Sequence, residues 1–346
     1  MRVVFFGVLF LALSSCHVHK FSANLPDLPL AMSNNAVALV QKGKGIELYS
    51  FNGLLAGKSW QDISNKVFKW SQNRWKEIQP PAIAQNVLAS TAVSVGEMIY
   101  IIGGYTVAQD GKETSIANIL QYNSQQNSWS VLSKMPVAVD DTVALVYKQR
   151  YLYLVSGWHD TDNVSLVQVF DLQLKRWSQA SAFPLPAVFG HSGGIVDNKI
   201  LICDGVKVVK NSNKRDFVAS PECALGIIDV KNPAVIHWQK IAHHSTRSYY
   251  RMAAVGDAKN QRFVFAGGSD NPYNYDGIGY NKIPSKPSSH VFVYDLKNER
   301  WHDYPEIIAP SMDHRALLFD GDWYYIIGGM RHEQKVSAKI EKFKLH

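Results

Sequence analysis

The chain lacks most features that mark membrane-spanning, multidomain or nucleic-acid-binding proteins. After the N-terminal segment, no apolar run is long enough to cross a bilayer. From Leu25 onward there is no low-complexity tract and no stretch with the composition of a linker. The formal net charge is +7, but the basic residues are scattered instead of forming a stripe. This distribution argues against a nucleic-acid partner.

The composition supports a large core. Apolar residues make up 46% of the 346 residues and aromatic residues 12%. Length alone suggests two domains, but a closed all-β array takes this size as one domain.

A short unit recurs along the chain and is clearest between Ile99 and Trp129. It contains a β-rich run, a glycine pair, a loop, a second apolar run, a polar turn and a tryptophan. The second position of the glycine pair recurs at Gly53, Gly104, Gly157, Gly205, Gly268 and Gly329. Five units end on Trp75, Trp129, Trp177, Trp238 and Trp301. A period of roughly 50 residues with two apolar runs favours a propeller over a helical solenoid.

This combination of Gly-Gly, aromatic strand and Asn/Lys-x-Trp resembles the kelch repeat of β-propellers. The resemblance covers about residues 21–346 and implies an all-β, six-bladed kelch-type β-propeller. Glycine suits a turn where a Cβ atom would collide with the neighbouring blade, and the tryptophan ring seals the interface between blades. Expected blades span residues 30–80, 81–135, 136–183, 184–241, 242–304 and 305–346. Residues 21–27 resemble the ends of other units, so we expect an N-terminal strand to complete the C-terminal blade.

The first residues have the pattern of an export signal. Met1-Arg2 precedes the apolar run Val3 to Leu13, which is too short to span a membrane. The following Leu13-Ser14-Ser15-Cys16 resembles a bacterial lipoprotein box. The resemblance implies a signal peptide at residues 1–15, a lipid on Cys16 and a tether at 16–20. The chain would then face the periplasm from a membrane of the bacterial envelope, the outer membrane in a Gram-negative organism. An ordinary signal peptide with an incidental Cys16 is the alternative.

Two cysteines remain in the mature chain, Cys203 and Cys223. Cys203 ends one apolar run, and Cys223 precedes the run expected to pair with it. Outside the cytoplasm these two residues form either a cross-strand disulfide or two free thiols.

Strand alternation places two sets of segments on one face of the propeller. These are the segments that enter each inner strand and the loops that follow the glycines. The entering segments carry Asp141, His191, Arg251, His314 and Arg315. At a channel mouth, Asp141, His191 and His314 are candidates for proton transfer. Arg251 and Arg315 are candidates for binding a carboxylate. The alternative is that these side chains are structural hydrogen-bonding groups.

The longest loop, residues 269–284, is rich in tyrosine and asparagine, a composition typical of sugar-binding surfaces. Candidate ligand-binding residues here and in the preceding entering segment are Tyr249, Tyr250, Tyr273, Tyr275, Tyr280, Asn271 and Asn274. The alternative is an Ω-like loop packed on its own side chains. No metal or cofactor is predicted, because the acidic residues lack EF-hand spacing. Adjacent histidines such as His243 and His244 also point apart on a strand.

Two kinds of enzyme contain propellers that this repeat pattern resembles. The propeller of galactose oxidase holds copper with two tyrosines and two histidines, one tyrosine being cross-linked to a cysteine. This chain lacks the accessory domains and a recognisable tyrosine partner for either cysteine, which excludes a copper oxidase. Bacterial sialic-acid mutarotases resemble this chain in their size, in being exported and in having six kelch-like blades.

Two functions therefore remain open at this stage. The first is a monomeric, lipid-anchored propeller that binds a carbohydrate or protein partner on its loop face. The alternative is a mutarotase-like isomerase that acts on an acidic sugar such as N-acetylneuraminate.

Overall fold

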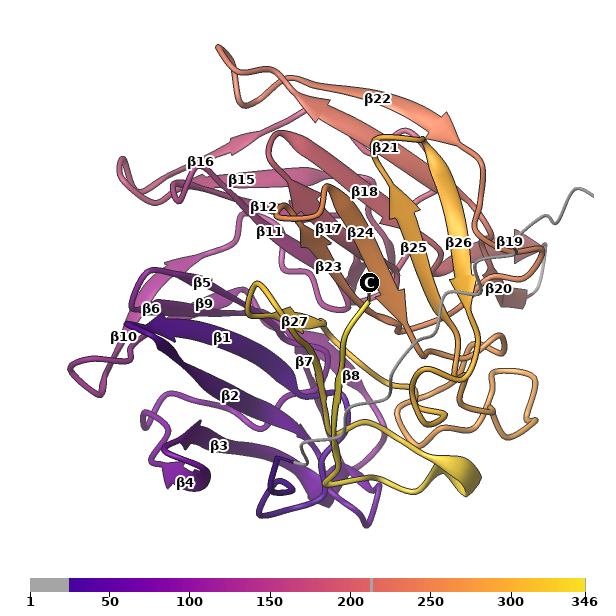
Figure 1. Ribbon diagram of the computed structural model, residues 1–346. Helices are drawn as coiled ribbons and strands as arrows, with labels where there is room; N and C mark the ends of the chain where they lie inside the picture. The colour runs from indigo at the N-terminus through magenta and orange to yellow at the C-terminus, as the bar shows by residue number, and fades with distance from the viewer. Residues whose placement is uncertain (1–24, 212–213, 346) are drawn as a thin grey trace, which may run out of the picture.

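The chain folds into six antiparallel sheets around a common axis (Figure 1). The computed structural model describes residues 25–211 and 214–345. The only helical elements in this part of the chain are the short 3-10 turns η1 (Trp60–Asp62) and η2 (His332–Gln334). No helix among these residues is long and apolar enough to cross a membrane. The predicted all-β, six-bladed propeller is confirmed.

Each sheet is one blade, numbered in chain order. Blade 1 contains β1 (Ala36–Lys42), β2 (Gly45–Leu54), β3 (Ile63–Ser71) and β4 (Arg74–Ile78). Blade 2 contains β5 (Thr91–Val95), β6 (Met98–Ile102), β9 (Asn118–Asn123) and β10 (Ser128–Lys134). Blade 3 contains β11 (Val143–Tyr147), β12 (Tyr151–Val155), β15 (Val167–Asp171) and β16 (Arg176–Gln179). Blade 4 contains β17 (Ser192–Val196), β18 (Lys199–Cys203), β21 (Cys223–Ile228) and β22 (Ile236–Ile241).

Blade 5 contains β23 (Ala253–Asp257), β24 (Arg262–Ala266), β25 (Val291–Asp295) and β26 (Arg300–Tyr304). Blade 6 contains β27 (Leu318–Phe319), β28 (Tyr324–Ile327) and β29 (Ile340–Phe343). Three two-stranded hairpins project from blades 2, 3 and 4. They are β7 (Tyr105–Val107) with β8 (Glu113–Ser115), β13 (Trp158–His159) with β14 (Asp162–Asn163), and β19 (Val206–Asn211) with β20 (Lys214–Ala219).

Burial follows the position of a strand within its blade. The second strands, such as β12 and β24, are buried along nearly their whole length, because neighbouring blades cover both faces of the sheet. The outermost strands, such as β4 and β16, alternate between half-buried and exposed side chains. The apolar core is therefore a series of layers between blades.

The glycine pairs let neighbouring backbones approach closely. A Cβ atom on the first glycine would meet the entering segment of the next blade, as at Gly103, where it would lie 2.4 Å from the Val139 carbonyl oxygen. A Cβ atom on the second glycine would meet the entering segment of its own blade. At Gly104 it would lie 2.6 Å from the Leu88 carbonyl oxygen. The predicted collision with a neighbouring blade thus holds for the first glycine and is wrong for the second.

The closing tryptophans join consecutive blades, as predicted. Each indole N–H donates a hydrogen bond to the end of the preceding blade or, for Trp75, to the N-terminal segment. The acceptors are the Pro26 oxygen for Trp75, Gln79 for Trp129, Ser133 Oγ for Trp177, Ser181 for Trp238 and Ala242 for Trp301. The ring of Trp129 also packs against Phe51 of blade 1, with centroids 6.0 Å apart.

A ring of hydrogen bonds, all between backbone groups except one, encircles the axis just before the inner strands. Its six residues, one per blade, have φ between 48° and 69° and are called the axial ring: Asn34, Ala89, Asp141, Gly190, Arg251 and Asp313. Each backbone N–H donates to a backbone carbonyl oxygen of the preceding blade: Asp141 to Ala89, Gly190 to Asp141, and Arg251 to Gly190. In blade 6 the donor is the N–H of His314, the residue after Asp313, and the acceptor is the Arg251 oxygen. Asn34 N–H donates to Asp313, and Asn34 Oδ1 accepts from Ala89 N–H. The ring therefore closes between the last blade and the first.

The seam of the propeller lies between the N-terminal segment and blade 6. Leu28 N–H donates to the Ala338 oxygen at 2.8 Å, and Met32 N–H donates to the Ser337 oxygen at 3.1 Å. The predicted closing strand at 21–27 lies largely outside the described residues, and residues 25–27 form no strand. Within the described residues, blade 6 therefore has three strands, tied to the start of the chain by these hydrogen bonds.

Cys203 and Cys223 are opposite each other in the paired strands β18 and β21 and are joined by a disulfide. This pair was one of the two alternatives left open by the sequence.

The glycine geometry gives a stability prediction. Gly104→Ala puts a Cβ atom on a residue with φ of 94° and against the Leu88 carbonyl oxygen. Gly96→Ala is the matched control, because Gly96 has φ of 56° and open space around the new Cβ atom. We expect Gly104→Ala to lower the free energy of unfolding by roughly 2 kcal/mol more than the control. Urea denaturation measures both, and equal values would contradict the close-approach argument.

Candidate functional site

Six isolated β-bridges bring each entering segment to the residue that follows the glycine position in the same blade. The bridges are Ser33–Leu54, Leu88–Tyr105, Asp140–Trp158, Phe189–Val206, Tyr250–Ser269 and Met312–Met330. Both sets of segments therefore share one side of the propeller, which we call the loop face. This is the arrangement that strand alternation predicted.

A cavity of about 230 Å³ opens among the hairpins and the long loop of the loop face. We call it the loop-face pocket. Its lining residues are Tyr105, Glu113, Asp140, Asp141, Trp158, Phe189, Phe217, Arg251, Asn274, Tyr275 and Tyr280. The walls come from β7–β8, β13, β20 and the long loop, and the base comes from entering segments. Residues from blades 2 to 5 thus meet at one site.

Aromatic rings form much of the pocket wall. Phe217 of β20 stacks on Tyr280 of the long loop, with ring centroids 4.2 Å apart. Trp158 packs edge-on against Phe189 at 5.3 Å and lies 5.9 Å from Phe217. The long loop therefore packs partly on a neighbouring blade and partly presents its side chains to the cavity.

A buried ion network forms the base of the pocket. Arg251 donates Nε to Asp141 Oδ1 at 3.1 Å and Nη1 to Asp313 Oδ1 at 3.0 Å. Arg315 Nη1 pairs with the same Asp141 carboxylate. The Arg251 guanidinium also lies over the Tyr250 ring at 4.8 Å. Both arginine side chains are only 2% exposed, so the two predicted carboxylate-binding groups are already paired with carboxylates of this chain.

The pKa values of the acidic groups in the pocket are shifted in different directions. Burial and the neighbouring Asp141 charge raise the pKa of Asp140 well above its ordinary value, and burial also raises the pKa of Glu113. Burial opposes the charge on Asp141 too, but Arg251 and Arg315 outweigh it and lower the pKa of Asp141. Asp140 therefore takes up a proton more readily than an ordinary aspartate, whereas the neighbouring Asp141 loses its proton more readily. Ser115 Oγ donates a hydrogen bond to Asp140 Oδ2 at 2.6 Å.

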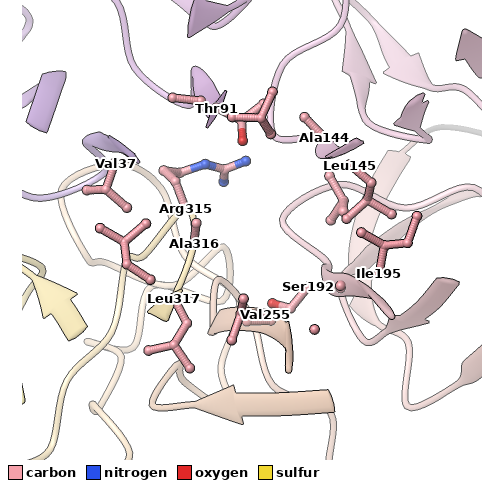
Figure 2. Close-up of a pocket in the computed structure, with 18 of the residues that line it drawn as sticks. Val37, Thr91, Ala144, Leu145, Ser192, Ile195, Val255, Arg315, Ala316 and Leu317 are labelled. Atoms are coloured by element: carbon pink, nitrogen blue, oxygen red, sulfur yellow. The ribbon is translucent and has the colours of Figure 1, made fainter. Parts of the chain in front are cut away.

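A second cavity of about 280 Å³ occupies the channel between the inner strands. Figure 2 shows Arg315 reaching across this channel toward Thr91. Because Arg315 pairs with Asp141 of the loop-face pocket, this ion pair lies between the two cavities. His191 lines the channel, where its Nε2 lies 2.8 Å from the Val155 oxygen and burial lowers its pKa to about 4.

The other predicted residues are distributed as follows. His314 is buried, its Nε2 is 2.8 Å from Ser311 Oγ, and its ring lies against Gly329. Burial lowers its pKa to about 3, so it is a neutral packing and hydrogen-bonding group. Tyr249, Tyr250 and Tyr273 are buried beneath the face.

Within the long loop, Asn271 bonds to Ile283 and Asn281. Asn274, Tyr275 and Tyr280 are the predicted loop residues that reach the pocket. Cys16 lies outside the described residues.

Sequence reasoning placed the right loops on this face but missed several wall residues. Glu113, Trp158 and Phe217 lie in loops assigned to the loop face, and none was singled out. The signal that could have found them is their place in the sequence. They are large aromatic or acidic residues within the loops that begin directly after the glycine positions.

Residues Gly190 to Gly194 have the spacing Gly-x-Ser-x-Gly of a hydrolase nucleophile elbow. That motif requires a turn from a strand into a helix. Here Ser192 begins the inner strand β17, and its Oγ donates to the Met252 oxygen at 3.0 Å. Ser192 is therefore a structural hydrogen-bond donor.

Outside the lining of the pocket, one group of three metal-ligating side chains comes together among the described residues. It consists of Asp204, His243 and His244.

Comparison with known proteins agrees with this architecture. The kelch motif model matches residues 88–136, which contain the strands of blade 2. Human Kelch-like protein 15 is 22% identical over 145 residues, 42% of this chain and 23% of that protein. Kelch-like protein terF of Aspergillus terreus (strain NIH 2624 / FGSC A1156) is 23% identical over 324 residues, 90% of this chain and 64% of that protein. Rat (Rattus norvegicus) Kelch domain-containing protein 3 is 24% identical over 259 residues, 69% of this chain and 62% of that protein.

The chain spans about a quarter of Kelch-like protein 15 and less than two thirds of the other two relatives. Among solved structures, that of YjhT superimposes with a TM-score of 0.71 and 16% identity, covering 93% of this chain and 97% of YjhT. At this identity the likeness shows the fold. The chain is a six-bladed β-propeller that carries a kelch motif in its second blade.

Proposed function

We propose that the loop-face pocket binds a carbohydrate. The observation that carries this proposal is a cavity of about 230 Å³ in which aromatic rings alternate with carboxyl groups and Asn274. The apolar face of a sugar ring stacks on aromatic side chains, and its hydroxyl groups pair with carboxyl and amide groups.

The charges of the pocket favour hydroxyl-rich over strongly anionic ligands. Arg251 reaches the pocket already paired with Asp141 and Asp313, so a ligand carboxylate would compete with both. Glu113 and Asp140, whose pKa values are raised, offer both hydrogen-bond donors and acceptors to hydroxyl groups.

The aromatic wall gives a binding prediction. Phe217→Ala removes the ring that stacks on Tyr280, and we expect it to weaken sugar binding by at least about tenfold. The matched control is Ile283→Ala, in the same loop as Tyr280 but with a side chain that is 59% exposed. NMR titration with galactose, N-acetylglucosamine and N-acetylneuraminate measures the affinities. Equal affinities for the two variants, or no binding of any of these sugars, would contradict the proposal for this pocket.

A second candidate function is a mutarotase-like isomerase, favoured by the unequal pKa values of Asp140 and Asp141. Ring opening of a sugar needs a proton on the ring oxygen and removal of the proton from the anomeric hydroxyl. Asp140, in its protonated form, supplies the first proton, and an ionised carboxylate such as Asp141 accepts the second. The bond between ring oxygen and anomeric carbon breaks to give an open-chain carbonyl, and reclosure yields either anomer. The resemblance to sialic-acid mutarotases makes N-acetylneuraminate the substrate to test.

The isomerase function predicts faster exchange between the anomers of N-acetylneuraminate in the presence of the protein, measured by NMR exchange spectroscopy. Asp140→Asn removes the acid while keeping the shape of the side chain, so we expect at least about a 100-fold loss of the accelerated rate. Asp270→Asn, at a partly exposed ion pair with Arg247, is the control and should retain the rate. An unchanged exchange rate with the wild-type protein would exclude this activity on this sugar.

We further propose that the chain is exported as a monomer and anchored in the bacterial envelope through a lipid on Cys16. The resemblance of residues 13–16 to a lipoprotein box supports this proposal. The wild-type chain should incorporate labelled palmitate and fractionate with membranes, whereas Cys16→Ser should do neither. Soluble periplasmic material from both chains would instead indicate an ordinary signal peptide.

A further inference from the structure

Two adjacent histidines converge on one buried carboxylate between blades 4 and 5. His243 and His244 follow the end of β22, so they do not alternate as strand residues do. Their rings lie 4.0 Å apart and are tilted by 35°. His243 Nε2 is 2.9 Å from Asp204 Oδ1, and His244 Nε2 is 2.7 Å from Asp204 Oδ2. The sequence-based expectation that these rings point apart is therefore wrong.

Both imidazoles present Nε2 to the same carboxylate, and Ser245 contacts the other nitrogen of His243. The His243 Nδ1 atom lies 2.7 Å from the Ser245 carbonyl oxygen and 3.2 Å from the Ser245 backbone nitrogen. A ring nitrogen donates to the first of these groups or accepts from the second, so both tautomers of His243 have a partner. The contact of each Nε2 with Asp204 is favourable when either a proton on the ring or a metal ion lies between the two atoms.

The surroundings of the cluster have the features of a metal site. Asp204 Oδ1 accepts the Tyr249 N–H at 2.8 Å, and Ser245 holds His243 on the other side. Such outer contacts orient the ligands of protein-bound metals. Asp204 and His244 side chains are fully buried, and His244 stacks on Phe292 with centroids 4.1 Å apart. His243 is 10% exposed, which leaves an approach from solvent.

The distances suit a first-row transition ion. The three ligand atoms lie within 4.8 Å of one another. Two atoms about 2.1 Å from a common ion and 2.9 Å apart subtend an angle of about 90°. Two imidazoles and one carboxylate form a ligand set that such ions accept, with water in the remaining positions.

We propose that Asp204, His243 and His244 form a binding site for a divalent transition-metal ion. The ion links the connection between blades 4 and 5 to the residue that follows Cys203 of the disulfide. The site is distinct from the loop-face pocket, since none of its residues lines that cavity. It does not depend on the proposed carbohydrate function.

Zinc binding to the purified, untagged chain tests this proposal after treatment with a chelator. Isothermal titration with ZnCl₂ should show one tight site per chain, and Zn²⁺ should raise the Tm, because it binds the folded state preferentially. Asp204→Asn and His243→Gln should each weaken Zn²⁺ binding by at least about tenfold. His237→Gln, at an exposed histidine of β22, is the matched control and should bind as wild type does.

Cobalt provides a measurement that does not depend on any variant folding. Co²⁺ bound at this site should give visible d–d absorption bands and paramagnetically shifted imidazole resonances from two histidines, which Zn²⁺ displaces. Wild-type protein without these signals, or Zn²⁺ binding that Asp204→Asn and His243→Gln leave unchanged, would overturn the proposal. The cluster would then be a structural hydrogen-bonded group in which both imidazoles contact Asp204 without an ion.

Discussion

The axial ring is the constraint on which the rest of the structure depends. Five of its six members are not glycine yet have positive φ, a conformation that costs L-residues roughly 1–2 kcal/mol each. Hydrogen bonds from blade to blade and between Asn34 and both of its neighbours hold this conformation in place. Because the ring fixes every entering segment at the same level, Asp141, Arg251 and Asp313 meet near the axis although they are far apart in the chain.

The ion network built on this ring explains why its arginines are not free ligands. A buried guanidinium is tolerated when it is paired and hydrogen-bonded, and Arg251 satisfies this with two carboxylates. The cost is that Asp141 stays ionised, which discourages ionisation of Asp140 next to it. One structural requirement, neutralising Arg251 and Arg315, thus adds to the effect of burial in raising the pKa of Asp140 in the pocket.

The fold could be predicted from the sequence because its constraints repeat. Gly104 lies against the entering segment of its own blade and Trp129 packs against the preceding blade, so the glycine returns in every blade and the tryptophan in five of the six. The candidate site could be predicted only in outline. Trp158 and Phe217 lie on hairpins specific to single blades, and no periodic signal marks them. The pairing of Arg315 with Asp141, 174 residues apart, depends on closure of the ring, which residue types alone do not reveal.

Closure also affects how the protein loses its structure. In an open solenoid the terminal repeats touch one neighbour each, and unfolding begins there at low cost. Here the hydrogen bonds of Leu28 and Met32 to blade 6, and of Asn34 to Asp313, give every blade two neighbours. Detaching any blade would break two interfaces at once, so partly unfolded forms are strongly disfavoured. Among the described residues no blade is terminal, so the propeller should melt as one cooperative unit.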